Sequence, residues 1–308
     1  MQDAVTDAAM RMQAFQTVER LSQQHETLSS EQLRSGFIFG GERVPLINPQ
    51  RGIFKPQKMW RLLSIRTVFP KSGSRIWYDD QRDVLKHLDA AEETLDYAFM
   101  GKDPNAADNR WLREAMEDHI PIIYFVGVSP ARCIARIGAF IVGWDPVNFR
   151  AHVAFSASSM ASQSSLPEAP ERRYSMRQTK QRVHQARFRE MVMDAYGGRC
   201  AFSDIREKEL LDAAHIIGDT NEDLGQPVIG NGLLLTKTHH AAFDCKLIGV
   251  DTDYRIHVAP RIMRVKDGPT LEALKKLDGQ GLLLPTRKAD QPDRERLKMS
   301  FDEFRAAM

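Results

Sequence analysis

The feature that most constrains this chain is a pair of short apolar segments that each carry one polar residue. His215 stands within the run LLDAAHII (210–217), which has the length and composition of a β-strand. A polar loop, residues 218–229, leads to a second apolar segment, Gly230–Leu235, in which Asn231 stands near the start. The pattern predicts a strand, a long loop and a second short segment.

A helix is expected directly after the second segment. Thr238 has the side chain of an N-cap, and the sequence THHAAFDCKLI begins there. On this helix His240 and Asp244 are four residues apart, so both project from one face. A strand, a loop and a helix can therefore bring the imidazole of His215 opposite an imidazole–carboxylate pair.

Such a set of groups suits phosphodiester hydrolysis. A neutral histidine can deprotonate water near neutral pH because its ordinary pKa lies close by. A divalent cation stabilises the charge that develops on the scissile phosphate, and imidazole with carboxylate or amide oxygens suits Mg²⁺, Mn²⁺ or another transition metal. One such residue alone is more often a buried, hydrogen-bonded side chain, but the ordered set within residues 215–244 favours a site.

Three motifs in this block resemble those of HNH nucleases of the ββα-metal fold, written A-A-H-I, N-G-L-x-L and H-x-x-F-D. In this sequence they are Ala213–Ile216, Asn231–Leu235 and His240–Asp244. The resemblance implies that His215 is the general base and that Asn231 holds the loop that positions it. It also implies that His240 is a catalytic metal ligand, which Asp244 supports from one turn further along.

The sequence departs from the family pattern at one metal position. Many HNH domains carry an acidic or histidine ligand just before the base, and Ala214 stands there. Either Asp212 comes close enough to act as a ligand beside His240 and Asp244, or the cation is held by few protein ligands and much water. The sequence does not decide whether His239 or His240 is the ligand.

No structural zinc is expected. Many relatives bind zinc through two C-x-x-C knuckles, whereas Cys200 is followed here by Ser203, and Thr236 stands where a third cysteine is common. Zinc needs about four soft ligands to contribute folding energy. Cys200 and Cys245 are therefore expected to be small buried apolar side chains.

The amino-terminal half predicts a helix followed by a curved sheet. Residues 5–35 carry apolar side chains at spacings of three and four without Gly or Pro. Short segments rich in β-branched and aromatic residues follow, with one helix, Asn109–His119, among them. The segments are Leu62–Phe69, Arg75–Tyr78, Leu95–Met100, Pro121–Val128, Ile134–Val142 and Arg150–Phe155. Several short strands with few helices are typical of a curved sheet or small barrel, so the fold class is α+β.

These strands resemble the SRA-like (PUA-like) domains that precede HNH modules in modification-dependent restriction endonucleases. The motifs are VPLINPQRGIFKP (44–56), IWYDD (76–80), DYAFMGKDP (96–104), DNRWLREAM (108–116) and IYFVGVSPAR (123–132). The resemblance implies that a modified cytosine is turned out of the duplex into an aromatic pocket. Carboxylates can accept from cytosine N4. The candidate pocket residues are Tyr78, Asp79, Asp80, Tyr97 and Trp111. The alternative is ordinary: Trp77 or Tyr78 belongs to the core, and Asp79 and Asp80 form a turn.

A stretch rich in Ser, Ala and Pro, residues 157–170, has the composition of an interdomain linker. It predicts an SRA-like recognition domain at 1–156 and an HNH endonuclease domain at 171–308.

A basic segment follows the predicted linker. Eight Arg or Lys lie between residues 172 and 199 against Glu190 and Asp194, a local excess of +6. Contact with DNA phosphates and a merely solvated helix face explain this bias about equally. The residues expected to contact DNA are Arg172, Arg173, Arg177 and Lys180, together with Arg110 and Arg113 beside the loop 101–109.

Charge and hydropathy exclude two classes of protein. With 43 Lys and Arg against 41 Asp and Glu, the net charge of +2 excludes binding of nucleic acid by bulk charge alone. The longest apolar stretch, Ile120–Val128, is far shorter than the roughly 18 residues of a membrane span. The first ten residues, MQDAVTDAAM, have no basic segment typical of a secretory signal. A cytoplasmic protein without a membrane partner is therefore expected.

Together these features predict a restriction endonuclease that recognises modified cytosine in double-stranded DNA and cuts it with a metal-dependent HNH domain. Two alternatives stay open. One is a nuclease or nickase indifferent to modification, and the other is a non-catalytic reader whose nuclease half has decayed. The sequence does not show which modification is read, where the cut falls, or whether a homodimer cuts both strands.

Overall fold

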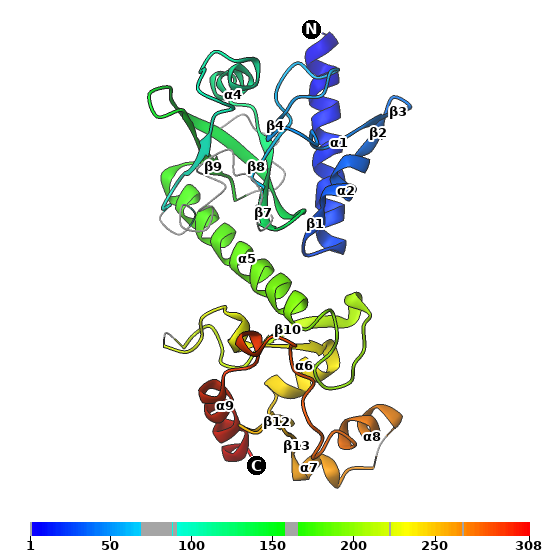
Figure 1. The fold of residues 1–308 in the computed structure, drawn as a ribbon. Coiled ribbons are helices and arrows are strands. Elements are labelled where there is room, and N and C mark those ends of the chain that lie inside the picture. Colours follow the sequence, from blue (N-terminus) through cyan, green and yellow to red (C-terminus); the bar gives the residue numbers. More distant parts are fainter. Residues whose placement is uncertain (1, 69–87, 89–90, 158–165, 222, 267) are drawn as a thin grey trace. The chain divides into compact units, whose positions relative to one another are not determined.

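The computed structural model describes residues 2–68, 88, 91–157, 166–221, 223–266 and 268–308 (Figure 1). The chain divides into two compact units, residues 1–186 and 187–308. Each unit has its own hydrophobic core. Within the described residues, no helix is long and apolar enough to cross a membrane.

Among its described residues, the first unit is built on a sheet of seven strands that curls into a half-barrel (Figure 1). The strands are β1 (Leu28–Ser29), β4 (Ile53–Phe54), β5 (Ser64–Arg66), β6 (Leu95–Ala98), β7 (Ile122–Ser129), β8 (Arg132–Asp145) and β9 (Arg150–Phe155). Their order is β4-β5-β7-β8-β9-β6, and β1 pairs with β8. Of the strand pairs that the structure describes in this sheet, only β5–β7 is parallel. A separate hairpin, β2 (Phe37–Phe39) with β3 (Glu42–Val44), turns at two glycines of positive φ.

Both faces of β7 are covered, which explains why its buried residues 122–128 do not alternate between apolar and polar. Ile123 and Phe125 belong to a core that includes side chains of helix α1 (Gln2–Gln24). Tyr124 and Val126 point to the opposite face and belong to a second core. Alternate side chains of a strand face opposite sides, so a strand buried on both faces has no polar alternation.

Two helices contribute to the second core of this unit. Helix α4 (Ala107–Glu117) supplies Leu112 and Ala115. The first part of helix α5 (Ala169–Ala195) supplies Met176, Val183 and Ala186. The last part of α5, from Phe188 onward, contributes instead to the core of the second unit. The predicted domain limits at residues 156 and 171 stay a prediction, and residues 158–165 of the predicted linker lie outside the described residues.

The predicted strands that fall on described residues are confirmed as β5 to β9, and the predicted helix at 109–119 is confirmed as α4. The predicted strand Arg75–Tyr78 lies outside the described residues. The single helix predicted over 5–35 is wrong, because α1 ends at Gln24 and helix α2 (Ser30–Ser35) begins separately. Ser29 and Gln32 form a capping box in which each side chain accepts a hydrogen bond from the other's backbone N–H, at 3.1 and 2.7 Å.

The second unit places two antiparallel strands and a helix at its centre. These are β10 (Leu211–His215), β11 (Gly232–Thr236) and α6 (Lys237–Asp244). The remaining elements are the short helices η2 (Lys208–Leu210), η3 (Ile229–Asn231) and η4 (Lys288–Asp290), the hairpin β12 (Ile248–Val250) and β13 (Ile256–Val258), and helices α7 (Pro260–Met263), α8 (Pro269–Lys275) and α9 (Arg294–Ala306). Helix α9 packs Phe304 so closely on Gly249 that a Cβ there would lie 2.6 Å from the ring.

A buried ion pair holds α1 against the rest of the first unit. Arg11 and Asp7 are each 6% exposed, and Arg11 Nη2 donates to Asp7 Oδ2 at 2.8 Å. Arg11 also donates to the carbonyls of Leu62 and Pro121. Asp7 Oδ1 accepts from the backbone N–H groups of residues 60 and 61. The pair therefore ties α1 to segments more than fifty residues away.

We predict that Asp7→Ala lowers the free energy of unfolding by about 3–5 kcal/mol, because it leaves the Arg11 charge buried without its counter-ion. Glu117→Ala is the control. It removes the exposed partner of Arg113 in an i,i+4 pair at 3.8 Å, which contributes about 0.5 kcal/mol or less. Urea unfolding followed by tryptophan fluorescence measures both. Equal losses in the two variants would contradict the assigned importance of the buried pair.

Candidate functional site

The strand pair β10–β11 and helix α6 position the predicted site residues. In the ladder, His215 pairs with Gly232 and Leu211 pairs with Thr236. Thr236 Oγ1 accepts a hydrogen bond from the backbone N–H of His239 at 3.2 Å and caps α6. The predicted cap at Thr238 is wrong, because the threonine that ends β11 already occupies the N-cap.

His215 lies at the end of β10 in a partly water-free environment. Its ring stacks on Phe188, with centroids 3.9 Å apart and an angle of 13° between the planes. Burial lowers the pKa of His215 below its ordinary value of 6.5 and is the largest contribution. The charge of His240 lowers the pKa further. The negative charges of Asp219, Asp244 and Asp212 raise it, but each by less than burial lowers it. The surroundings of His215 therefore favour the neutral form of its imidazole.

Asn231 is fully buried beside the chain that leaves β10. Its Oδ1 accepts from the N–H of Ile217 at 2.9 Å, and its Nδ2 donates to the carbonyls of Ile217 and Gln226 at 3.0 and 3.1 Å. Its backbone carbonyl accepts from the N–H of Ile216 at 2.9 Å. These bonds fix the two residues that directly follow His215.

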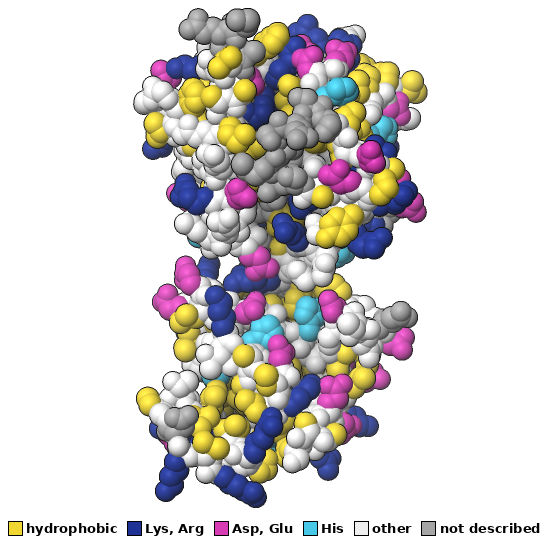
Figure 2. Space-filling model, turned by 180° about the vertical axis from the view of Figure 1, so that it is seen from behind, with side chains coloured by type: hydrophobic (Ala, Val, Ile, Leu, Met, Phe, Trp, Pro, Cys, Tyr) yellow, Lys and Arg dark blue, Asp and Glu magenta, His cyan; other side chains and the backbone are white. Residues whose placement is uncertain are grey.

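His240 lies between two carboxylates. Its Nδ1 is 3.0 Å from Asp212 Oδ2, and its Nε2 is 3.3 Å from Asp244 Oδ2. The hydrogen bond to Asp212 is the main reason that the pKa of His240 is raised, against the opposing effect of burial. Figure 2 shows histidine and acidic side chains together at the surface of this unit. His240 and His215 are thus shifted in opposite directions.

Asp212 has a further partner that sequence reasoning missed. Arg189 Nε lies 3.8 Å from Asp212 Oδ1, and Arg189 Nη2 donates to the carbonyl of Leu211 at 2.8 Å. Burial raises the pKa of Asp212, but the hydrogen bond and charge of His240 and the charge of Arg189 bring it below the ordinary value. The sequence placed Arg189 only within a basic segment, and no spacing rule connects it to a strand 23 residues away.

His239 points to a different set of groups from its neighbour. Its Nδ1 lies 3.3 Å from Cys200 Sγ, and its ring contacts Phe202 with centroids 5.5 Å apart. Burial raises the pKa of Cys200, but hydrogen bonds from His239, Ser203 and nearby backbone lower it to about 7. Of the two adjacent histidines, only His240 contacts the carboxylates.

The expectation for the two cysteines holds in part. Cys200 is buried, as predicted, but it is hydrogen-bonded rather than inert. Cys245 is exposed, so the prediction that it is buried is wrong. It occupies the C-cap of α6, where the chain leaves the helix at the surface.

The donor set around His240 suits a divalent cation in its chemistry, since imidazole and carboxylate are common ligands of such ions. In the part of the chain that the structure describes, no group of three or more His, Cys, Asp or Glu side chains is arranged to hold a metal ion. The reason is visible at His240, where Asp212 and Asp244 lie against opposite ring nitrogens and do not converge on one point.

The predicted base pocket is described only in part. Tyr78, Asp79 and Asp80 lie outside the described residues. Tyr97 is 3% exposed and packs edge-on against Tyr124 in the core, with centroids 5.8 Å apart. Trp111, on α4, is half-buried, and Lys55 Nζ lies 5.3 Å from its ring centroid.

The arginines predicted to contact DNA differ in their surroundings. Glu93 accepts from Arg172 Nη2 at 2.9 Å and from Arg173 Nη1 at 2.8 Å, so these two charges are already partly balanced. Arg113 pairs with Glu117, whereas Arg110 and Arg177 are exposed. Lys180 is half-buried on α5. Their role in DNA contact stays a prediction.

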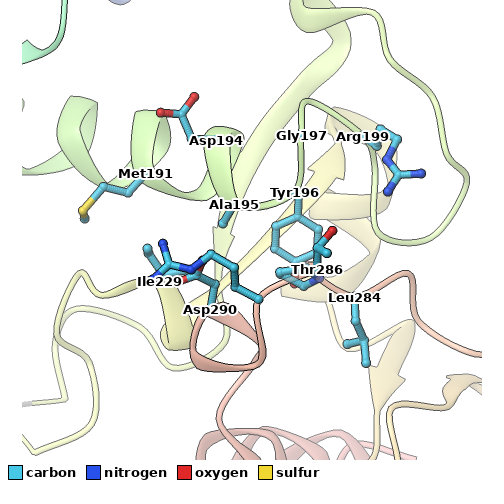
Figure 3. A pocket seen from close by; sticks show the side chains of 12 residues that line it. Met191, Asp194, Ala195, Tyr196, Gly197, Arg199, Ile229, Leu284, Thr286 and Asp290 are labelled. Atoms are coloured by element: carbon cyan, nitrogen blue, oxygen red, sulfur yellow. The ribbon is translucent and has the colours of Figure 1, made fainter. Parts of the chain in front are cut away.

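A pocket of about 440 Å³ lies elsewhere in the second unit (Figure 3). It is lined by the end of α5 and the turn after it, by Ile229, and by the segment 284–290. Its charged lining residues are mixed in sign: Asp194, Arg199, Arg287 and Asp290. None of the predicted site residues lines it.

Comparison with known proteins identifies the region of the site. Residues 200–251 match the HNH endonuclease family, so the chain contains an HNH endonuclease domain, and the enzymes of this family are phosphodiester hydrolases. This match confirms the resemblance predicted from the three motifs, and the family implies a divalent metal and a DNA substrate. No curated protein matches the sequence. Among solved structures, the modification-dependent TagI restriction endonuclease matches with 14% identity and a TM-score of 0.31, covering 83% of this chain and 86% of that chain.

We predict that His215 and His240 titrate on opposite sides of the ordinary histidine pKa in the metal-free protein. The pKa of His215 falls below 6.5 through burial, and that of His240 rises through its carboxylate partners. Asp219→Asn should lower the pKa of His215 further, because it removes a charge that favours the protonated ring. NMR titration of ¹³C-labelled histidine measures each value.

Asp223→Asn, an exposed change in the same loop, is the control and should leave His215 unaffected. A pKa of His215 above 6.5, or identical responses to the two variants, would contradict the assigned electrostatics.

Proposed function

Given an HNH endonuclease domain at residues 200–251, we propose that this chain is a DNA endonuclease of the ββα-metal type in which His215 is the general base. One observation carries the assignment. His215 is stacked on Phe188, where burial favours the neutral imidazole, and it lies on the strand next to a helix whose His240 is held between two carboxylates. A neutral imidazole can take a proton from water, whereas an imidazolium cannot.

Asn231 acts as the residue that positions the base. Its side chain bonds both backbone polar groups of Ile217, and its carbonyl bonds Ile216, so the chain just after His215 cannot shift along the strand. The ring of Phe188 fixes the plane of the imidazole from the other side. Together they hold the imidazole in one orientation, which proton transfer over hydrogen-bond distance requires.

His240 and Asp244 are the residues that would hold a divalent cation. Asp244 is 60% exposed beside Nε2, so this side of the imidazole is accessible from solvent. Asp212 accepts the proton on Nδ1 and fixes the ring, as carboxylates commonly do behind metal-binding histidines. Arg189 in turn helps to keep Asp212 ionised. A cation bound there would stabilise the charge that develops on the scissile phosphate.

We predict that three histidine variants separate the roles in cleavage of plasmid DNA. His215→Ala should lose about 10²–10⁴-fold or more in rate while DNA affinity is unchanged, because a general base contributes little to binding. His240→Ala should also be slow, but raised Mn²⁺ or Mg²⁺ should restore part of its activity. His239→Gln is the control on the same helix and should cleave within a few-fold of the wild type, since His239 faces Cys200.

Wild-type cleavage by His215→Ala would remove this residue from the mechanism. Coincident metal titration curves for wild type and His240→Ala would exclude His240 as a ligand, and His239 would then be the candidate.

We further propose that the amino-terminal unit selects DNA that contains modified cytosine. The proposal rests on the resemblance of its motifs to SRA-like domains, together with the curled sheet and the aromatic side chains that the unit contains. Phosphate contacts carry no information about a base modification, so selection needs a shaped pocket for a flipped base. Trp111 is half-buried and is the more suitable of the two described candidates, because Tyr97 lies within the core.

We predict that the full chain cleaves plasmid carrying 5-methyl-, 5-hydroxymethyl- or glucosylated cytosine faster than the same unmodified plasmid, in Mg²⁺ or Mn²⁺. A fitted pocket for a small added group supports a preference of roughly ten- to a hundred-fold. Equal cleavage of all substrates would favour a nuclease or nickase indifferent to modification. Selective binding without cleavage would favour a non-catalytic reader.

A further inference from the structure

Arg136 on β8 is a buried cation without a counter-ion. The residue is 7% exposed, and its Nε is buried and has no hydrogen-bond partner. Its guanidinium lies 5.5 Å from the ring centroid of Phe155. Among the described residues it makes no ion pair or hydrogen bond through the guanidinium. Since its other two nitrogens are also unbonded but not buried, the tip of the side chain reaches the surface.

The position of Arg136 in the sheet places it on the face that α5 covers. The β7–β8 register pairs Arg136 with Tyr124, and cross-strand partners point to the same side. Tyr124 belongs to the core to which α5 contributes Met176 and Val183. The arginine therefore lies between the sheet and the first part of α5.

A second arginine on α5 lies close to the first. Arg182 directly precedes the buried Val183 and follows the buried Thr179, so it stands at the edge of the helix face that packs on the sheet. Burial and, secondly, the charge of Arg182 lower the pKa of Arg136 to about 10. Arg182 is exposed, and it too has no carboxylate partner within the described parts of the chain.

Other arginines of this unit show how unusual this arrangement is. The equally buried Arg11 has Asp7 at 2.8 Å, and Arg172 and Arg173 share Glu93. A buried charge is costly unless it is paired and hydrogen-bonded. Arg136 and Arg182 are thus neighbouring arginines, one of them nine-tenths buried, and neither has an acidic partner among the described residues.

We propose that Arg136 and Arg182 together bind a phosphodiester group of the DNA backbone. A guanidinium presents parallel N–H donors that match two phosphate oxygens, and the anion would offset both the burial of Arg136 and its repulsion from Arg182. The proposal rests on the proposed endonuclease function and deepens it, because it assigns a backbone contact to two residues outside the set predicted from sequence. Because the contact is to phosphate, it should contribute equally to the affinity for modified and for unmodified DNA.

The test measures binding of a short duplex by the full chain in EDTA, so that cleavage does not interfere. Arg136→Gln with Arg182→Gln should bind modified and unmodified duplexes at least about ten-fold more weakly. The slope of log K against log salt should fall by about 0.9 for each lost contact. The control, Arg20→Gln with Arg43→Gln, removes the same charge from exposed positions of the same unit and should leave the slope unchanged. Arg182→Gln alone, at an exposed position, keeps the test valid if the double variant does not fold.

Unchanged affinity and slope in a folded double variant would overturn the proposal. So would a loss confined to modified DNA, which would indicate base recognition. If the wild type binds no DNA, the proposed function fails. The anion site is then tested separately, by measuring whether inorganic phosphate raises the Tm of the protein. A phosphate-dependent rise in Tm that the double variant lacks would support the site, and no difference in Tm would overturn it. Stabilisation by phosphate, combined with DNA binding that the substitutions do not alter, would overturn the assignment to the DNA backbone.

Discussion

The candidate site depends on the side-chain amide of Asn231. The β10–β11 ladder ends where His215 pairs with Gly232, and beyond that point the chain has no strand partner. At this position the side chain of Asn231 supplies the hydrogen bonds that a strand partner would otherwise make. Its amide bonds both backbone polar groups of Ile217 and the carbonyl of Gln226. A buried amide with its partners satisfied is rigid, and substitution would leave backbone groups unpaired in the interior. The side chain of Asn231 therefore fixes the chain beyond the end of the β10–β11 ladder, which itself sets the register of His215.

Two histidines of the same unit acquire opposite properties from their surroundings. The ring of His215 is covered by Phe188, and the loss of water favours its neutral form. His240 is similarly buried, but its two carboxylates outweigh that burial and favour its charged form. The pKa of His240 therefore depends more on its two carboxylate partners than on its burial. One fold thus supplies a ring that favours the neutral form and a second ring that is held between two carboxylates.

The amino-terminal unit shows the same rule for arginine. Arg11 is buried with a carboxylate and two carbonyl acceptors, and it joins α1 to the start of two strands. Arg136 is buried to the same degree against an aromatic ring and a second arginine. The first arrangement is complete within the described residues and stabilises the fold. The second has no acidic partner among the described residues, and this is the observation from which we propose a DNA phosphate contact.

The sequence by itself determined the elements and the chemistry that depend on local pattern. Enrichment in β-branched and aromatic residues, the turn residues and the three ordered motifs identified most strands of the half-barrel, the β10–β11–α6 unit and the HNH domain. Local signals also account for the errors at residues 25–29 and at the start of α6, where a capping box and Thr236 compete with helix periodicity. Only the tertiary structure decided which of two adjacent histidines meets Asp212, that Arg189 supports it, and that Arg136 lacks a counter-ion. These are contacts between residues distant in sequence, and their strength depends on burial and distance, which no spacing along the chain specifies.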